Sequence, residues 1–437
     1  MPSMEADAAR DAPRRAECRL ILLEPLRSSP VRETLKIAVR RLVLAAICVW
    51  PCVVIGTGCT TMALRRPLPR SGPHGVYLTW QRDPTTTMSI HWLSRGESGV
   101  GAIAWTPRDE DTWRAETATS HALPHSNRVV HSVELTGLDP DRDYRFRIEG
   151  AAAIHAFRTM PADASEPITF VAGGDVYKET FDKKMYVEAA ARDPMFALIG
   201  GDIAYDNGEP SRVKRWFHWL DAWDEYMVTS DGRLIPMVVA IGNHEVLGRY
   251  DQTPAEAPFF YSLFKWPGET GCNVLDFGDY MSVIVLDSTH THPIAGAQTE
   301  WLDRTLADRV RTPHLIVVYH VPAYPSVRRY DGPICASIRE HWVPLFEQYG
   351  VDVVFENHDH AYKRTPLIRN GRVDPDGVLY LGDGAWGANI RKVHVPENTW
   401  YLDRAVSVRH VIVTTIHGDE RRHEAVNEYG EVFDSYP

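Results

Sequence analysis

Residues 196–208, FALIGGDIAYDNG, combine a buried-strand pattern with two polar side chains that suit metal binding. The apolar run ends in Gly200 and Gly201, Asp202 follows directly, and Tyr205 comes three residues later. A short apolar run bounded by glycine is typical of a buried parallel strand. In an open α/β sheet, chemistry takes place just beyond the carboxyl ends of such strands. We therefore expect this strand to deliver Asp202 and Tyr205 to a functional site.

Four further strand-like runs end in the same kind of residue. ITFVAGGD ends at Asp175, IPMVVAIGNHE carries Asn243 and His244, HLIVVYH ends at His320, and VDVVFENHDH carries His358 and His360. Each of these residues alone has an ordinary explanation, such as a helix N-cap, a turn residue or a hydrogen-bonded core histidine. Their convergence on neighbouring strand ends instead predicts a two-metal site, because carboxylate, amide, imidazole and phenolate groups bind hard and borderline metals. Asp359 is expected to point away from this site.

The size and charge of the chain limit its possible functions. A length of 437 residues is enough for two domains with a sizeable core. A content of 44% hydrophobic and 24% charged residues is ordinary for a globular protein. The net charge of -11 lacks the positive field that non-specific nucleic-acid binding requires. We therefore expect no nucleic-acid partner.

The N-terminal segment has the pattern of an export signal. Residues 1–30 show no sustained pattern, and we expect them to be disordered or to precede the true translation start. Residues 31–59 contain Arg40 and Arg41, an apolar run over 42–55, and small residues before Cys59. Basic, apolar and small-residue regions in this order are typical of a secretory signal, and the apolar run is too short to span a bilayer. The alternatives are a lipoprotein signal with lipid on Cys59, a simple cleaved signal, and an uncleaved anchor.

These alternatives predict an exported protein that is periplasmic, attached to a membrane as a lipoprotein, or secreted. Residues 60–73, rich in proline and arginine, are the predicted linker to the first domain. Cys272 and Cys335 then either form one disulfide in an oxidising compartment or remain two unpaired thiols. The oligomeric state is not readable from the sequence.

Residues 74–160 have the pattern of an all-β sandwich of immunoglobulin or fibronectin type III kind. Six short strand-like segments, beginning with VYLTW and MSIHWL, are separated by turns rich in Asp, Pro, Gly and Ser. The segment LTGLDP, residues 135–140, is followed by Tyr144. This arrangement resembles the corner at which a tyrosine braces a loop in fibronectin-type domains.

Residues 166–437 alternate strand-like and helix-like segments, which favours βαβ units. The expected helices cover residues 181–192, 211–228, 297–309 and 337–349. The last third returns to strands, of which VSVRHVIVTTI is the clearest. A second sheet packed on the first would give a four-layer α/β/β/α sandwich.

Together these motifs resemble the purple acid phosphatases, within the wider calcineurin-like metallophosphoesterases. The five blocks of that family, GDxG, GDxxY, GNH(E/D), VxxH and GHxH, are similar to the five strand ends described above. They stand here as GDVY at 174–177, GDIAY at 201–205, GNHE at 242–245, VVYH at 317–320 and NHDH at 357–360. The resemblance runs from residue 74 to the end and includes the late GDG at 382–384.

The resemblance implies a ligand set for each of two metals. One metal is held by Asp175, Asp202, Tyr205 and His360, and the other by Asn243, His320, His358 and the shared Asp202. A tyrosinate with two carboxylates suits Fe(III), and the second set suits a divalent ion, namely Fe, Zn or Mn. The family pattern further implies attack of a metal-bound hydroxide on phosphorus, with His244 as hydrogen-bond donor or general acid beside the phosphate.

Three departures from the family pattern concern the substrate side. Tyr177 stands where the purple enzymes have glycine and is expected to narrow the pocket. Asn357 replaces glycine before the last HxH and is expected to cost backbone freedom. Arg328 and Arg329 occupy the stretch where plant enzymes carry substrate-side histidines, so both are candidate contacts of a phosphate ester.

We expect a hydrolase of small phosphate monoesters. Two other functions are open on the sequence alone. One is a phosphodiesterase or phospholipid-acting enzyme on the same metals, and the other is a catalytically inactive surface-binding protein. The presence of all seven expected ligands argues against the inactive alternative.

Overall fold

The computed structural model describes residues 72–96, 101–176, 182–265 and 271–437. All of them belong to one compact unit. The predicted signal, Cys59 and Tyr177 lie outside the described residues. Within those four ranges, no helix has the length and apolar character needed to cross a membrane.

The N-terminal domain is a sandwich of two four-stranded antiparallel sheets, as predicted. One sheet has the order β1 (His74–Thr79), β2 (Thr87–Arg95), β6 (Arg128–Thr136), β5 (Thr119–Ala122). The other has the order β4 (Arg114–Thr117), β3 (Ala102–Pro107), β7 (Asp143–Ile148), β8 (His155–Arg158). Strands β4 and β5 were not among the six expected segments, because almost all of their residues are exposed and no buried alternation marks them.

The tyrosine corner of this sandwich is present. The Tyr144 hydroxyl accepts a hydrogen bond of 2.8 Å from the backbone N–H of Asp139. The ring of Tyr144 stacks on Phe157 with centroids 5.3 Å apart. The tyrosine thus ties the loop before β7 to the core, as its sequence context predicts.

The second domain contains two sheets whose strands run mostly parallel near the site. The six-stranded sheet has the order β11 (Met237–Val239), β10 (Ala197–Ile199), β9 (Ile168–Gly173), β21 (His410–His417), β22 (Glu420–Asn427), β23 (Val432–Tyr436). The seven-stranded sheet has the order β12 (Asn273–Phe277), β13 (Met281–Val285), β14 (His314–Val318), β15 (Val353–Glu356), β19 (Leu379–Gly382), β16 (Tyr362–Arg364), β20 (Arg404–Val406). Strands β9, β10 and β11 are parallel, as are β13, β14, β15 and β19. A short hairpin, β17 (Ile368–Arg369) and β18 (Arg372–Val373), extends from the second sheet.

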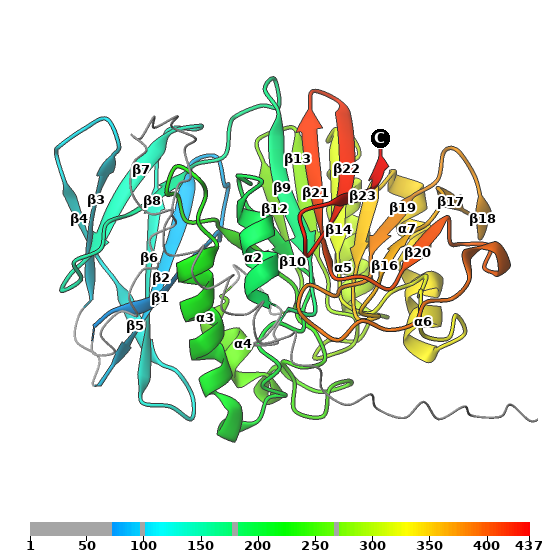
Figure 1. Cartoon of the computed structure of the whole chain (residues 1–437), viewed down its shortest axis with the longest axis horizontal. Coiled ribbons are helices and arrows are strands. Elements are labelled where there is room, and N and C mark those ends of the chain that lie inside the picture. The colour runs from blue at the N-terminus through cyan, green and yellow to red at the C-terminus, as the bar shows by residue number, and fades with distance from the viewer. Residues whose placement is uncertain (1–71, 97–100, 177–181, 266–270) are drawn as a thin grey trace, which may run out of the picture. The chain divides into compact units, whose positions relative to one another are not determined.

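Alternate residues of the strands build separate layers of core. Phe170 and Leu198 belong to the same buried cluster as Ile316 and Val353, so the two sheets pack face to face (Figure 1). The opposite face of the first sheet is covered by α2 (Asp182–Ala190) and α3 (Lys214–Tyr226). The opposite face of the second is covered by α5 (Ala297–Ala307), α6 (Pro333–His341) and α7 (Val343–Tyr349). The predicted α/β/β/α sandwich is therefore confirmed.

Two helices differ from the sequence-based expectation. The helix expected over 337–349 begins at Pro333 and is divided at Trp342 into α6 and α7. Pro344 follows the break, and its missing N–H cannot continue the hydrogen-bond ladder of α6. Helix α4 (Pro258–Leu263) was not expected, because six residues show too little periodicity to be recognised. The remaining helical turns, at 210–212, 254–256 and 396–398, are of 3-10 type.

The sandwich packs directly on the second domain. The indole of Trp80, fully buried, meets Phe196 and Phe277 edge-on, with centroids 6.0 and 5.8 Å away. The Tyr77 hydroxyl donates a 2.7 Å hydrogen bond to the carbonyl of Leu263 at the end of α4. The two cores are thus continuous.

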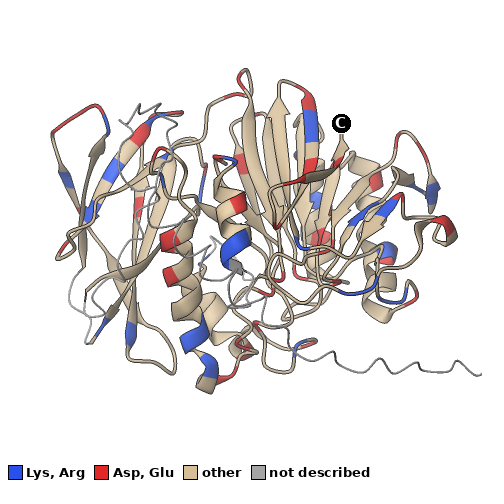
Figure 2. Ribbon diagram, viewed as in Figure 1, with Lys and Arg blue, Asp and Glu red and all other residues tan. Residues whose placement is uncertain are grey.

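Charged groups of both signs are distributed over the described ribbon rather than separated (Figure 2). Cys272 and Cys335 are not joined to each other by a disulfide. Of the two alternatives drawn from the sequence, the disulfide is therefore not the one the structure adopts.

Candidate metal centre

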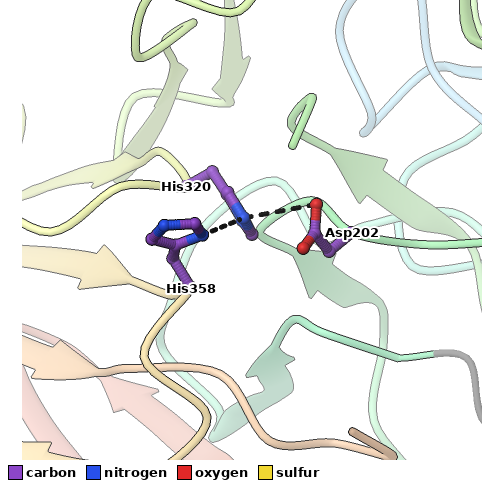
Figure 3. A group of neighbouring side chains, drawn as sticks. All are labelled: Asp202, His320 and His358. Carbon is purple, nitrogen blue, oxygen red and sulfur yellow. Dashed lines mark hydrogen bonds and ion pairs between the residues drawn. The ribbon is translucent and has the colours of Figure 1, made fainter. Parts of the chain in front are cut away.

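The polar side chains at the strand ends meet at one edge of the two packed sheets. Asp175 follows β9, Asp202 follows β10, Asn243 follows β11, His320 follows β14, and His358 and His360 follow β15. Two buried groups have ligand atoms that all lie within 4.8 Å of one another: Asp202, His320 and His358, and Asp175, Asp202 and His360. Asp202 is common to both. Figure 3 shows the first group, with His320 between the other two side chains.

In the group around Asp175, three atoms that could bind a metal lie close together: a carboxylate oxygen, an imidazole nitrogen and a phenol oxygen. The His360 Nε2 atom lies 2.9 Å from Asp175 Oδ1. The Tyr205 hydroxyl lies 3.4 Å from each of these two atoms. The other ring nitrogen of His360, Nδ1, donates to the carbonyl of Asn389 at 3.0 Å, which turns Nε2 toward the group.

The group around His320 is held in the same way. His320 Nδ1 donates to the carbonyl of Gly200 at 2.8 Å, so its Nε2 atom faces the group. That Nε2 atom lies 3.3 Å from Asp202 Oδ1, 3.3 Å from Asn243 Oδ1 and 3.0 Å from His358 Nδ1. Ligands of one cation with bonds of about 2.1 Å stand about 3 Å apart, so the spacing suits coordination.

One buried carboxylate oxygen without a hydrogen-bond partner supports the binding of a metal ion here. Asp202 Oδ2 is buried and has no hydrogen-bond partner, although the chain satisfies Oδ1 with the backbone N–H of His244 at 2.7 Å. Burial raises the pKa of Asp202, but His320, His244 and His358 outweigh it, and the net shift is downward. Although burial lowers it, the Asp202 carboxylate raises the pKa of His320 to about 9. A buried, ionised oxygen without a donor is the group that a bridging cation would satisfy.

The backbone is strained where these side chains converge. Five of the seven expected ligands have a positive φ: Asp175 at 57°, Asp202 at 53°, Tyr205 at 55°, His358 at 77° and His360 at 58°. Non-glycine residues avoid this left-handed region, and each such residue costs on the order of 1 kcal/mol or more. The surrounding fold therefore holds the side chains in directions that the local sequence would not choose.

Glu245 anchors two of the strand-end loops, a role that sequence reasoning did not assign. Its fully buried carboxylate accepts three backbone N–H groups: Asp202 at 2.8 Å, Ile203 at 2.7 Å and Gly242 at 2.9 Å. Burial and the neighbouring Asp202 carboxylate raise the pKa of Glu245. The carboxylate thus fixes the position of Asp202 relative to the GNHE loop. The signal was present in the sequence as the last residue of that block.

The GDG segment at 382–384 holds His360 and Asp175 in place. The carbonyl of Asp383 accepts the backbone N–H of His360 at 2.8 Å. A Cβ at Gly384 would lie 1.9 Å from Asp175 Oδ2, so only glycine fits there. The buried ammonium of Lys363 lies against Glu356 and 3.4 Å from Asp383 Oδ1, which balances these carboxylates.

Asn357 does not have the strained backbone that its replacement of glycine was expected to cause. Its φ is not among the positive values, and the left-handed residue at this point is His358 instead. The Asn357 side chain donates to the carbonyl of Tyr319 at 3.0 Å. It also fills the space above two glycines, since a Cβ at Gly200 would lie 1.7 Å from Asn357 Nδ2, and one at Gly174 would lie 2.4 Å from Asn357 Oδ1.

His244 lies at the open side of the centre. Its ring stacks on Tyr205 with centroids 4.3 Å apart, and Nδ1 lies 2.5 Å from Asn207 Oδ1. Nε2 is 3.9 Å from Asp202 Oδ2, and the side chain is 21% exposed. Burial lowers the pKa of His244, and Asp202 opposes this shift. The ring is thus held between Tyr205 and Asn207, with Nε2 facing Asp202.

The two arginines of the predicted substrate side have different places. The Arg328 guanidinium lies against the backbone carbonyl of His358, at 2.6 Å. Arg329 is 83% exposed and pairs with Asp331 at 2.6 Å. Among the described residues, no contact joins the side chain of Arg329 to the centre. His290, a further candidate proton donor, is fully buried, with Nε2 3.1 Å from Ser288 Oγ and Nδ1 donating to the carbonyl of Arg249 at 3.1 Å.

These features define a metallophosphoesterase-type α/β/β/α enzyme preceded by a β-sandwich. A family model described as purple acid phosphatase, N-terminal domain, matches residues 73–170. One described as calcineurin-like phosphoesterase matches residues 168–362.

Comparison with individual proteins narrows the family. The chain is 30% identical over 361 residues to purple acid phosphatase 18 of Arabidopsis thaliana, covering 78% of each chain. It is 28% identical over 299 residues to purple acid phosphatase 15 of the same plant, covering 60% of this chain and 54% of that relative. The solved purple acid phosphatase PPD1 from yellow lupin (Lupinus luteus) seeds has the same fold, with a TM-score of 0.71 at 18% identity over 84% of this chain and 74% of that one. The chain belongs to the purple acid phosphatase family and is a hydrolase acting on phosphate esters.

Proposed function

We propose that this protein hydrolyses phosphate monoesters at a dimetal centre that holds Fe(III) and a divalent ion of iron, zinc or manganese. The observation that carries the proposal is the pair of buried candidate ligand groups that share Asp202, whose Oδ2 atom has no hydrogen-bond partner. The Fe(III) set would be Asp175, Asp202, Tyr205 and His360. The divalent set would be Asp202, Asn243, His320 and His358. Donor chemistry supports this division, because phenolate and carboxylate favour the harder ion.

Different residues of the chain would position the metals and bind the phosphate. When bound, the two metals would polarise the ester oxygens and activate water. Asp202 would set the separation of the two ligand sets, since Glu245 and the His244 backbone N–H fix it from both sides. His244 Nε2 would donate a hydrogen bond to the phosphate or a proton to the departing oxygen. Its stacking on Tyr205 limits its rotation, which favours one direction of approach.

The test compares the wild type with Asp202→Asn. Metal content is measured by mass spectrometry, and hydrolysis of p-nitrophenyl phosphate is followed in parallel. We expect the variant to lose detectable hydrolysis and to retain fewer metals, because one carboxylate neutralises and positions two cations. The matched control is Asp111→Asn, which removes a charge of the same kind from a fully exposed side chain in the sandwich. Two retained metals with near-normal turnover in Asp202→Asn would overturn the proposal.

We further propose that the protein is exported and carries lipid on Cys59, which attaches it to a membrane. The support is the basic, apolar and small-residue order of residues 31–59. Cys59→Ala should then move the protein from the membrane fraction to the soluble fraction, and metabolic labelling with a fatty acid should be lost. Unchanged membrane association would instead favour an uncleaved anchor over 42–55.

A further inference from the structure

Two guanidinium groups meet at a backbone oxygen of the candidate metal centre. The His358 carbonyl accepts a hydrogen bond of 2.6 Å from Arg328 Nη1 and one of 3.3 Å from Arg391 Nη1. Because both reach the same oxygen, the two nitrogens lie within about 6 Å of each other. The backbone also places Arg391 here, since its N–H donates to the carbonyl of His360 at 3.0 Å. Both arginines therefore border the residues that would hold the metals.

Only one of these two guanidiniums pairs directly with a carboxylate among the described residues. Asp359 is fully buried and belongs to neither candidate ligand group; it pairs with Arg328 at 2.5 Å and also accepts the backbone N–H groups of Val327 and Arg328. No carboxylate in the described part of the chain pairs with Arg391, whose guanidinium donates to the His358 carbonyl. Although burial lowers it, the carboxylates of Asp359 and Asp175 raise the pKa of Arg328, whereas Arg391 has no such direct carboxylate partner among the described residues. Like charges at such short range are unfavourable unless an anion lies between or beside them.

The position of these arginines differs from that of the metal ligands themselves. The side chain of Arg328 is 33% exposed, and Arg391 is also partly exposed, so both are open to a ligand. Burial raises the pKa of Tyr250 and of Tyr205, and Arg328 and Arg391, respectively, oppose these shifts; the Tyr250 hydroxyl lies 3.2 Å from His358 Nε2. An anion held by both guanidiniums would therefore lie beside His358, at the border of the candidate metal centre.

The geometry points to a second anion subsite, formed by Arg391 and Arg328, that takes a further phosphoryl group of the substrate. Arginine is suited to this task because its planar fork binds phosphate oxygens in pairs and keeps its charge at every working pH. The inference rests on the proposed phosphoesterase function and narrows its substrate class to esters or anhydrides with a second phosphoryl group. Simple monoesters are hydrolysed without use of the subsite.

The test is a substrate comparison with Arg391→Gln, Arg391→Lys and a control. Glutamine keeps a donor for the His358 carbonyl but removes the charge, and lysine restores a point charge without the fork. The substrates are p-nitrophenyl phosphate, inorganic pyrophosphate and glucose 1,6-bisphosphate. The control, Arg372→Gln, removes the same charge from a side chain that is 72% exposed on the β17–β18 hairpin.

We expect Arg391→Gln to raise KM for the doubly phosphorylated substrates about tenfold or more, while KM for p-nitrophenyl phosphate changes less than about twofold. The KM of Arg391→Lys for these substrates should lie between those of Arg391→Gln and the wild type, and the KM of Arg372→Gln should match that of the wild type. An effect on pyrophosphate alone would assign the subsite to anhydrides, and an effect on both would assign it to any second phosphoryl group. Equal changes for all three substrates, or none, would overturn the subsite.

Calorimetric titration of the metal-loaded protein with inorganic pyrophosphate and with inorganic phosphate separates this inference from the proposed function. A protein that hydrolyses none of the substrates contradicts the proposed function. The subsite is still decided in that case, because Arg391→Gln must weaken pyrophosphate binding more than phosphate binding. Unaltered thermal unfolding of each variant shows that the fold is intact.

Discussion

Glu245→Gln tests whether a buried carboxylate holds the metal-bearing loops together. Glutamine has the same shape but only one acceptor oxygen. Placed at Oε2, that oxygen can still accept the N–H groups of Asp202 and Gly242, which Oε2 receives now. The amide NH2 group then faces the N–H of Ile203, which Oε1 accepts at 2.7 Å. One charge-assisted hydrogen bond is lost and two buried donors are left facing each other.

The expected cost follows from these contacts. A hydrogen bond to a charged acceptor contributes about 1.5–3 kcal/mol, and an unsatisfied buried donor costs about 1–3 kcal/mol. We therefore expect Glu245→Gln to lower the free energy of unfolding by about 2.5–6 kcal/mol. Urea unfolding followed by circular dichroism measures this directly. Because the same carboxylate positions Asp202, a chelator competition should also show faster loss of metal.

The matched control is Glu424→Gln on β22, whose carboxylate is 31% exposed and pairs with Arg422. Its effect should stay within about 0.5 kcal/mol. A loss of less than about 1 kcal/mol in Glu245→Gln, with unchanged metal retention, would refute the reasoning. It would mean that Glu245 is already neutral in the folded protein, since glutamine resembles the protonated acid.

Three further changes have defined outcomes. Tyr205→Phe should abolish visible absorption of the oxidised protein while the circular dichroism spectrum stays unchanged, and a colourless but fully active wild type would contradict Fe(III) at this site. His244→Ala should slow alkyl phosphates far more than nitrophenyl phosphate in steady-state kinetics, because only the alkyl leaving group needs a proton; equal losses would mean that the ring positions phosphate without acting as the acid. Burial lowers the pKa of His410 to about 4. The unfolded chain therefore binds this proton first, so stability should fall as pH drops from about 6.5 to about 4, by about 2–3 kcal/mol at pH 4.5. The urea midpoints of the wild type and of His410→Gln at pH 7.5 and 4.5 check this. If the midpoint falls equally in both proteins, His410 is not a source of the loss of stability at low pH.

Sequence patterns predicted the strands that are buried in the two central sheets. Strands such as β9 and β14 carry continuous apolar runs, and their polar ends indicated where the site would form. Strands β4 and β5 were missed because exposed edge residues such as those at 114–117 carry no apolar signal. The break between α6 and α7 was missed although Pro344 marks it, because proline is also common in the first turn of a helix.

The candidate site was predictable in its members but not in its geometry. Asp202 and His320 could be grouped because parallel strands end at one edge, yet their role as ligands stays a prediction. The positive φ of residues such as His358 is imposed by tertiary contacts and leaves no trace in a single sequence. Arg391 lies outside every block, in a segment without periodicity, so only the folded chain brings it to the His358 carbonyl.

The packing of Asn357 over two glycines makes these three positions epistatic. In the present chain, Gly200→Ala or Gly174→Ala would collide with the Asn357 amide, whereas the same change after Asn357→Gly would meet open space from that side. Conversely, asparagine at 357 fits without a clash only when residues 174 and 200 are both glycine. The order of substitution is therefore constrained at this corner of the metal centre, and a variant library that samples the three positions independently would consist mainly of clashing combinations.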